Sequence, residues 1–449
     1  MTRVPLWSIL TIALSAGIVV PAAAQTPLSL AEAIDTAIAG NPSLRAVGAA
    51  GTEARETARA ARSDWFPRFE VSESWHRSTQ PVAAFGTLLN AGRFTANDFA
   101  IDHLNSPGLV DGYTRRVGIS QMLFSSRVRA LTALAGSRAA SADARFDAAT
   151  ADLALRVAGA YGQVLAASAA VDAASAGLDW AIEDHRRADS RRTAGTATDA
   201  DVLAAAVQVA EMRVHGIEAS GDLANARAVL NHLMAVPLDR AFTLSLPDTP
   251  SSASSLPSVD ALTRDARANR AELREMTQAV AVADAERQLA QSAFRPELAA
   301  SAGYEWNGRD FTNRQSAWTI GAELRWSLSL GGADAARLAA GRAGADSARA
   351  AREAAAAAID LDVLTAHRRW LVALARLDVS RAVVDDAREA QRIVRQRYAA
   401  GMASMTDVLA AAAAWFNADA QNTTNRVGVI TAWAALARAT GQPMVPVSR

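Results

Sequence analysis

The chain has 449 residues, no cysteine, and equal numbers of basic and acidic side chains, 46 of each. A chain without cysteine holds no disulfide, no thiolate metal site and no thiol nucleophile. Its charges are evenly mixed and form no basic stripe, so we expect no nucleic-acid partner.

Residues 1–24 have the pattern of a secretory signal peptide. Arg3 precedes a largely apolar run over residues 4–20, and three alanines at 22–24 supply an Ala-x-Ala cleavage site. The alternative is an N-terminal membrane-spanning helix, but nothing after Ala24 resembles a stop-transfer flank. We therefore expect an exported chain that starts near Gln25. No later stretch is expected to provide the roughly 18 to 20 apolar residues of a spanning helix, so any further crossing must be made by strands.

The chain contains an internal repeat. Residues 124–237 recur as residues 330–443 at a constant spacing of 206, which also separates Gly195 from Gly401. The sequence predicts a first structural repeat over 25–247, a Pro- and Ser-rich linker over 248–257, and a second repeat over 258–449. Each repeat is expected to contain shorter helices, two strands, one very long helix and a returning helix.

Two strands are predicted in each repeat. Large apolar side chains alternate with charged or small ones over residues 67–75 and 116–123, and again over 297–306 and 318–330. This period of two is typical of half-buried strands. Tryptophan and tyrosine gather in these segments, as they do in the girdles at the two edges of a bilayer. The predicted girdle residues are Trp75, Tyr113, Tyr304, Trp306, Trp318 and Trp326.

The same strands are compatible with a soluble sandwich or with a sheet packed on helices. If they face lipid instead, four strands are too few to close a barrel, because the smallest closed form has about eight. Several chains must then share one barrel.

The first strand pair carries about 23 residues that the second lacks. Residues 77–112 include Pro81, Gly92 and the run Asn105-Ser106-Pro107-Gly108, which is a turn-rich composition. We expect a long loop on the extracellular side of the barrel.

A very long helix follows each strand pair. Residues 127–192 and 333–398 contain no proline, and either run would reach roughly 100 Å as a helix. An apolar heptad occurs in both copies at matched phase, which indicates coiled-coil packing. Its positions are Val157, Val164, Val171 and Leu178 in the first copy and Val363, Trp370, Leu377 and Val384 in the second. A soluble coiled-coil spacer is the alternative, which the neighbouring strands disfavour.

Each long helix is expected to turn back at a glycine, Gly195 or Gly401. Thr198 and Ser404 are good N-cap residues for the returning helices, which are predicted to run to about residues 235 and 440.

Several short motifs, in this order and spacing, resemble the TolC-type outer membrane efflux proteins over essentially the whole mature chain. The motifs are Leu28-Ser29-Leu30-Ala31-Glu32-Ala33 with Asn41-Pro42, Trp65-Phe66-Pro67, Gly331-Gly332, Arg397-Tyr398-Ala399-Ala400-Gly401 and Asp407-Val408-Leu409.

The resemblance implies an α+β membrane protein. Three chains would form a homotrimer and contribute four strands each to a shared 12-stranded β-barrel in the outer membrane. The helices would continue as a coiled-coil tunnel in the periplasm and dock on an adaptor (membrane fusion protein) bound to an inner-membrane pump. Such a duct conducts substrates passively, either in efflux or, as an alternative, in type I protein secretion. The rival function is a periplasmic coiled-coil adaptor or scaffold, which would require lipoyl-like and small β-barrel sequences around one helical hairpin.

The resemblance also implies roles at the helical tip. Tyr398 and Asp201 match positions that link the two helical hairpins, and Asp407 matches a position in a carboxylate ring across the pore. Ala403 and Ala410 depart from the residues that some relatives place there, an arginine and a second aspartate. The alternative for both aspartates is a charge that favours a helix N-terminus.

Docking on the adaptor is assigned to Gly195, Thr196, Gly401 and Met402, because small residues at a hairpin tip permit close approach by a partner. Plain turn chemistry is the alternative.

No feature indicates an enzyme or a cofactor. The six histidines never place two on one helical turn, so no metal site is predicted. The sequence has no Gly-rich phosphate loop and no nucleophile elbow.

Overall fold

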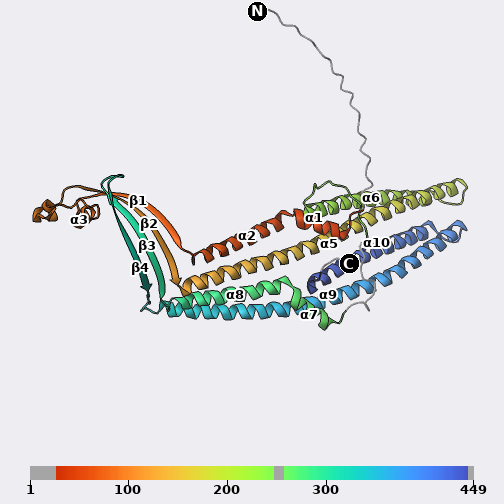
Figure 1. Cartoon of the computed structure of the whole chain (residues 1–449). Coiled ribbons are helices and arrows are strands. Elements are labelled where there is room, and N and C mark those ends of the chain that lie inside the picture. The colour runs from red at the N-terminus through yellow and green to blue at the C-terminus, as the bar shows by residue number, and fades with distance from the viewer. Residues whose placement is uncertain (1–26, 247–256, 443–449) are drawn as a thin grey trace, which may run out of the picture.

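The computed structural model describes residues 27–246 and 257–442, so the predicted signal peptide and nearly all of the predicted linker lie outside the described residues. In chain order the elements are α1 (Leu30–Gly40), α2 (Pro42–Ser63), β1 (Arg68–Ser78), α3 (Pro81–Asn90), η1 (Ala96–Phe99), α4 (Ile101–Asn105), β2 (Val110–Phe124), α5 (Ser126–Thr193), α6 (Asp199–Met234), α7 (Val259–Asn269), α8 (Ala271–Ser292), β3 (Glu297–Gly308), β4 (Arg314–Arg325), α9 (Ala333–Ala399) and α10 (Met405–Thr440). The strands lie at one end of an elongated molecule, and the α5–α6 and α9–α10 turns lie at the other (Figure 1).

The two long helices agree closely with the prediction. α5 has 68 residues and α9 has 67, which at 1.5 Å per residue gives each a length of about 100 Å. α2 and α6 lie beside α5, and α8 and α10 lie beside α9 (Figure 1). The heptad residues Val157, Val164, Val363, Trp370 and Leu377 are buried along this packing.

α5 corrects one sequence expectation. A window of 18 residues in α5 has a mean hydropathy of 1.2 and meets the length and composition of a spanning helix, although no such stretch was expected. α5 packs against α2, α6, α8 and α10, so its apolar surface serves the helical bundle.

The four strands form one antiparallel sheet in the order β1-β2-β3-β4. Ser74 lies opposite Thr114, Thr114 opposite Asn307, and Asn307 opposite Gln315. Residues in such a row share one face of the sheet, and the faces alternate along each strand. This register places small and polar residues on the face that contains Ser74, and most of the large apolar residues on the other face, which also carries the ion pairs of Glu73 with Arg115 and Arg314.

The last strand is shorter than predicted. β4 ends at Arg325, so Trp326, Leu328 and Leu330 belong to the connection that leads to α9. Here the backbone N–H of Ser329 donates to a carboxylate oxygen of Asp334 at 2.9 Å. This contact turns the chain toward α9, and the apolar alternation continues past the point where strand pairing stops.

The extra residues of the first strand pair also differ from the prediction. β1 and β2 extend into residues 77–112, and between them the chain forms α3, η1 and α4. Thr95 and Asp98 form a capping box at the start of η1. The segment is therefore a small folded unit and not an irregular loop.

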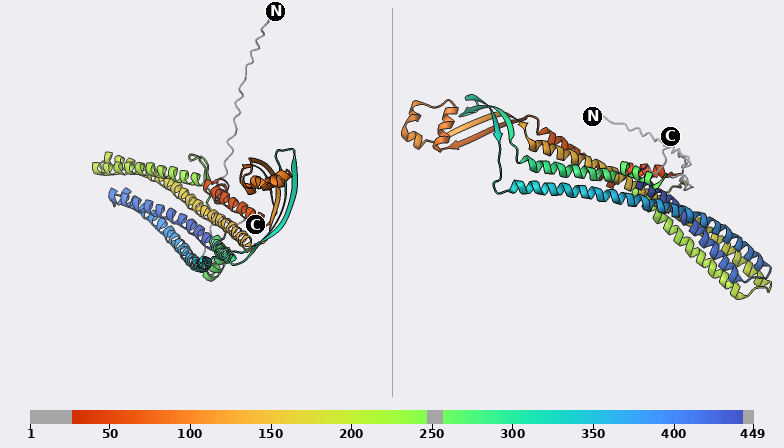
Figure 2. Two further views of the ribbon diagram at one scale, coloured as in Figure 1. Left: turned by 90° about the vertical axis from the view of Figure 1, so that its left-hand side faces the viewer. Right: turned by 90° about the horizontal axis from the view of Figure 1, so that it is seen from below.

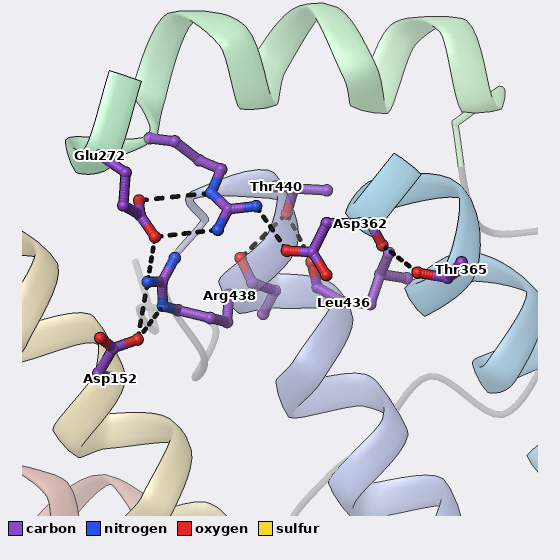
Figure 3. Close-up of polar contacts among 9 residues, drawn as sticks. Asp152, Glu272, Asp362, Thr365, Leu436, Arg438 and Thr440 are labelled. Atoms are coloured by element: carbon purple, nitrogen blue, oxygen red, sulfur yellow. Dashed lines mark hydrogen bonds and ion pairs between the residues drawn. The ribbon is translucent and has the colours of Figure 1, made fainter. Parts of the chain in front are cut away.

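An ion-pair network joins four helices near the middle of the bundle (Figure 3). Arg438 of α10 donates to Asp152 of α5 at 2.7 Å and also to Glu272 of α8. Arg270, at the start of α8, donates to Glu272 at 2.9 Å and to Asp362 of α9 at 2.6 Å. The network connects elements of both predicted repeats.

Candidate functional site

The two faces of the sheet differ in chemical character. On one face Arg116 pairs with Glu305 at 2.9 Å and Thr114 donates to Asn307 at 2.8 Å. The opposite face carries Phe69, Trp318 and Ile320, and the last of these is 73% exposed. Among the described residues, β1 and β4 have no further strand partner on their outer edges. One sheet thus presents an apolar face, a polar face and two open edges.

The predicted girdle residues divide between the two ends of the strands. Trp75 lies opposite Tyr113, and Tyr304 lies opposite Trp318. With Trp306, whose ring centroid is 4.6 Å from that of Tyr304, these residues occupy the half of the sheet that is remote from the helices. Trp326, beyond the end of β4, lies at the opposite end. Two aromatic levels are thus present, although their contact with lipid stays a prediction.

The far end of the helical bundle is formed by two tight turns. Gly195 and Gly401 have φ angles of 73° and 77°, a left-handed conformation that glycine adopts without strain. Just after them, the backbone N–H groups of Thr196 and Met402 donate to the carbonyl oxygens of Arg191 and Arg397 at 2.9 and 2.8 Å. This pattern closes the C-terminus of each long helix. The side chain of Met402 is exposed at the tip.

Both aspartates singled out from the sequence are helix-capping residues. Asp201 accepts hydrogen bonds from the backbone N–H and the hydroxyl of Thr198 at 2.9 and 2.8 Å. Asp407 accepts the same pair from Ser404, both at 2.8 Å. These hydrogen bonds lower the pKa of each carboxyl below its ordinary value, the one from the backbone N–H contributing most and the one from the hydroxyl next. The capping alternative is therefore present in the structure, and it leaves both carboxylates ionised at neutral pH.

Tyr398 lies at the contact between the two hairpins. The guanidinium of Arg191, on α5, stacks 4.4 Å from the centre of its ring and donates to its backbone carbonyl. Within the described part of the chain its hydroxyl is buried and has no hydrogen-bond partner, and burial raises the pKa of Tyr398. It makes no hydrogen bond to Asp201 in this single chain, and a link between the two residues stays a prediction.

A second contact between the hairpins was missed in the sequence. Asp184 of α5 accepts a hydrogen bond from Arg395 of α9 at 2.8 Å, and both side chains are nearly buried. The same guanidinium lies 4.3 Å from the ring centre of Trp180. Aspartate and arginine are common on helical surfaces. The sequence therefore does not single out these two residues, and only the packing of the two long helices shows that they pair.

The titratable residues that the structure describes form no metal site. Over residues 27–246 and 257–442, no group of three or more His, Asp or Glu side chains is arranged to hold a metal ion. His76 instead shares a hydrogen bond with Thr87 at 2.8 Å.

Comparison with known proteins agrees with this architecture. The family model described as outer membrane efflux protein matches residues 33–236 and 262–442. No curated protein matches the sequence.

Three solved structures illustrate the similarity of fold. The outer-membrane channel OprN is 20% identical, with a TM-score of 0.77 over 93% of this chain and 91% of that one. The outer membrane protein VceC of Vibrio cholerae is 19% identical, with a TM-score of 0.76 over 92% of this chain and 96% of that one. The open state of the MtrE outer membrane channel of Neisseria gonorrhoeae is 19% identical, with a TM-score of 0.77 over 94% and 90% of the two chains.

Proposed function

The chain belongs to the outer membrane efflux protein family, and on this premise we propose that three copies form one conduit, with a shared 12-stranded barrel and a periplasmic tunnel of helices. The family match supports the channel over the alternative of a periplasmic adaptor or scaffold. In this proposal the conduit does no chemistry, and solutes move because a pump elsewhere consumes energy.

The observation that carries the proposal is the two-faced sheet with two unpaired edges. Open strand edges are not tolerated in the hydrocarbon region of a membrane, because water is not there to satisfy their N–H and C=O groups. Pairing β4 of one copy with β1 of the next satisfies both edges, and three copies of four strands make a closed barrel of 12. The face that carries Arg116, Glu305 and Thr114 then lines the lumen, and the face that carries Phe69, Trp318 and Ile320 meets lipid.

Two neighbouring residues of β4 test this orientation. Ile320 lies on the apolar face and Thr319 on the polar face, and both are exposed in the single chain. A lysine on the lipid face costs about 2–4 kcal/mol near the bilayer midplane, and a lysine in the lumen does not. We expect Ile320→Lys to abolish heat-modifiable trimers in outer membranes, and Thr319→Lys to preserve trimers and change ion conductance in planar bilayers. Equal assembly of the two variants would contradict the orientation.

The helical tip is proposed as the gate. Asp407 would contribute to a ring of three carboxylates around the axis, which attracts cations. Tyr398, with Arg191 stacked on it and Asp201 nearby, would hold the hairpins together in the closed state. Support for the role of Tyr398 comes from its contact with Arg191, which joins α9 to α5.

The same tip is proposed to dock on a periplasmic adaptor bound to an inner-membrane pump. A Cβ added at Gly195 or Gly401 would meet no atom within 4 Å, so a partner can approach the backbone closely at Gly195, Thr196, Gly401 and Met402. We expect Gly195→Val/Gly401→Val to abolish efflux-dependent drug resistance while trimers remain in the membrane. Gly136→Ala, at an open helical position, is the control. Retained resistance in the valine variant would remove the docking assignment.

A further inference from the structure

The folded segment of residues 79–109, called the insertion here, is fastened to the end of the sheet. His76 of β1 shares a hydrogen bond with Thr87 of α3 at 2.8 Å. Arg93 donates to the carbonyl oxygen of Asp111 at 3.3 Å. A Cβ added at Gly92 would lie 2.8 Å from the side chain of Gln315. These contacts fix the insertion to β1, β2 and β4.

The fastening residues place the insertion on the polar face of the sheet. His76 is two residues from Ser74, which shares a cross-strand row with Thr114, Asn307 and Gln315. The two side chains that contact the insertion, those of His76 and Gln315, therefore belong to the face that lines the lumen in the proposed barrel. The left view of Figure 2 looks at this end of the molecule and shows the insertion, in orange, against the inner side of the curved sheet.

The insertion has a small aromatic core and an exposed apolar surface. The ring of Phe94 lies edge-on to those of Phe85 and Phe99, with centroids 4.7 and 5.0 Å apart. Val82, Phe99 and Ile101 are nevertheless 80%, 66% and 74% exposed. These three residues are called the apolar tip. Such side chains on the lumenal side of a channel have neither lipid nor their own sheet to cover them.

The size of the barrel decides what covers the apolar tip. Twelve strands about 4.8 Å apart and tilted by about 40° enclose a backbone diameter of about 24 Å. A helix with its side chains is about 10–12 Å wide, and three such helices around an axis need a circle of about 22–26 Å. Three insertions therefore fill the mouth and must contact one another.

We propose that the insertions of three copies pack together through Val82, Phe99 and Ile101 on the three-fold axis and narrow the extracellular exit. This inference rests on the proposed trimeric barrel. The contact places an apolar constriction at the end of the channel remote from the α5–α6 and α9–α10 turns. Such constrictions oppose the passage of water and of bulky polar solutes. In the trimer, the apolar tip of each insertion is thus covered by the apolar tips of the other two copies.

Thiol labelling of intact cells tests the proposal, because the chain has no cysteine of its own. Thr319→Cys places a thiol on the lumenal face, and Asn313→Cys places one in the turn between β3 and β4, outside the mouth. We expect a bulky polymer-linked maleimide to label Thr319→Cys about tenfold more slowly than Asn313→Cys, and a small maleimide to label both alike. Adding Val82→Asp/Ile101→Asp should bring the two rates together. Oxidation of Ile101→Cys should give covalent dimers.

The outcomes separate this inference from the proposed function. Rapid labelling of Thr319→Cys by the bulky reagent with the natural insertion, or no dimers from Ile101→Cys, overturns the constriction but leaves the channel intact. Failure of both reagents to label Asn313→Cys in cells that contain the protein contradicts its placement in the outer membrane, and the proposed function falls with the inference.

Discussion

Neutralising Glu272 should destabilise the helical bundle in a pH-dependent manner. This carboxylate lies between Arg270 and Arg438, which are 9% and 10% exposed, so the change Glu272→Gln removes a charge that both nearly buried guanidinium groups share. Burial alone would raise the pKa of Glu272, but hydrogen bonds from Arg270 and then Arg438 outweigh it and lower that pKa from 4.5 to about 2.

The magnitude follows from the two pKa values. A difference of about 2.5 at 1.36 kcal/mol each corresponds to about 3.4 kcal/mol. The side chain of Glu272 is still 30% exposed, and solvent screening reduces the figure to about 2 kcal/mol. Because the folded-state pKa is the lower one, this stability is present in full above pH 4.5 and is lost as the pH falls toward about 2.

Unfolding by guanidinium chloride in detergent measures the effect, with the circular dichroism of the helices as the signal. We expect Glu272→Gln to lower the unfolding free energy at pH 7 by about 2 kcal/mol, and the difference from wild type to shrink between pH 4.5 and about 2. Glu286→Gln, on the same helix and in an exposed pair with Arg138, is the matched control and should change stability by less than about 0.5 kcal/mol. Equal stability of Glu272→Gln and wild type at pH 7, or a difference that persists undiminished at pH 2, refutes the reasoning.

Three further predictions concern the tip. Asp184→Asn leaves the nearly buried Arg395 without its carboxylate and should lower the unfolding free energy by about 3–5 kcal/mol. The double change Asp184→Leu/Arg395→Met should restore most of that stability. No recovery in the double variant would contradict the account of the pair. Tyr398→Phe should leave channel closure in planar bilayers unchanged, because the hydroxyl has no hydrogen-bond partner among the residues that the structure describes. Tyr398→Ala should raise the open probability by removing the surface on which Arg191 stacks, and opening by the phenylalanine variant would favour a hydrogen-bonded link. Asp407→Asn keeps a capping oxygen but removes the charge, so it should abolish cation block without reducing trimer yield. The hydrogen bonds from Ser404 lower the pKa of Asp407 in the single chain, so the carboxylate is charged and wild-type block should be present at pH 7. Block that survives in the asparagine variant would exclude a carboxylate ring.

The pattern of residues along the chain was enough to predict most of the helices and strands. The proline-free, alanine-rich runs predicted helices over 127–192 and 333–398, and the structure has them at Ser126–Thr193 and Ala333–Ala399. Helix propensity, capping and turn geometry act over a few residues, so they can be read directly from the chain. The alternation of apolar and polar residues likewise predicted four strands with two unlike faces. It failed at 326–330, because alternation does not show whether a neighbouring strand is there to pair.

Only the tertiary structure decided which distant side chains meet. The pair of Asp184 and Arg395, the stacking of Arg191 on Tyr398 and the network around Glu272 all join helices that are far apart in sequence. Such contacts depend on the rotation and axial offset of one long helix against another, which heptads restrict to a face but do not fix residue by residue. The insertion shows the same limit. Its turn-rich composition predicted a loop, whereas packing among Phe85, Phe94 and Phe99 and the fastening at His76 fold it onto the polar face of the sheet.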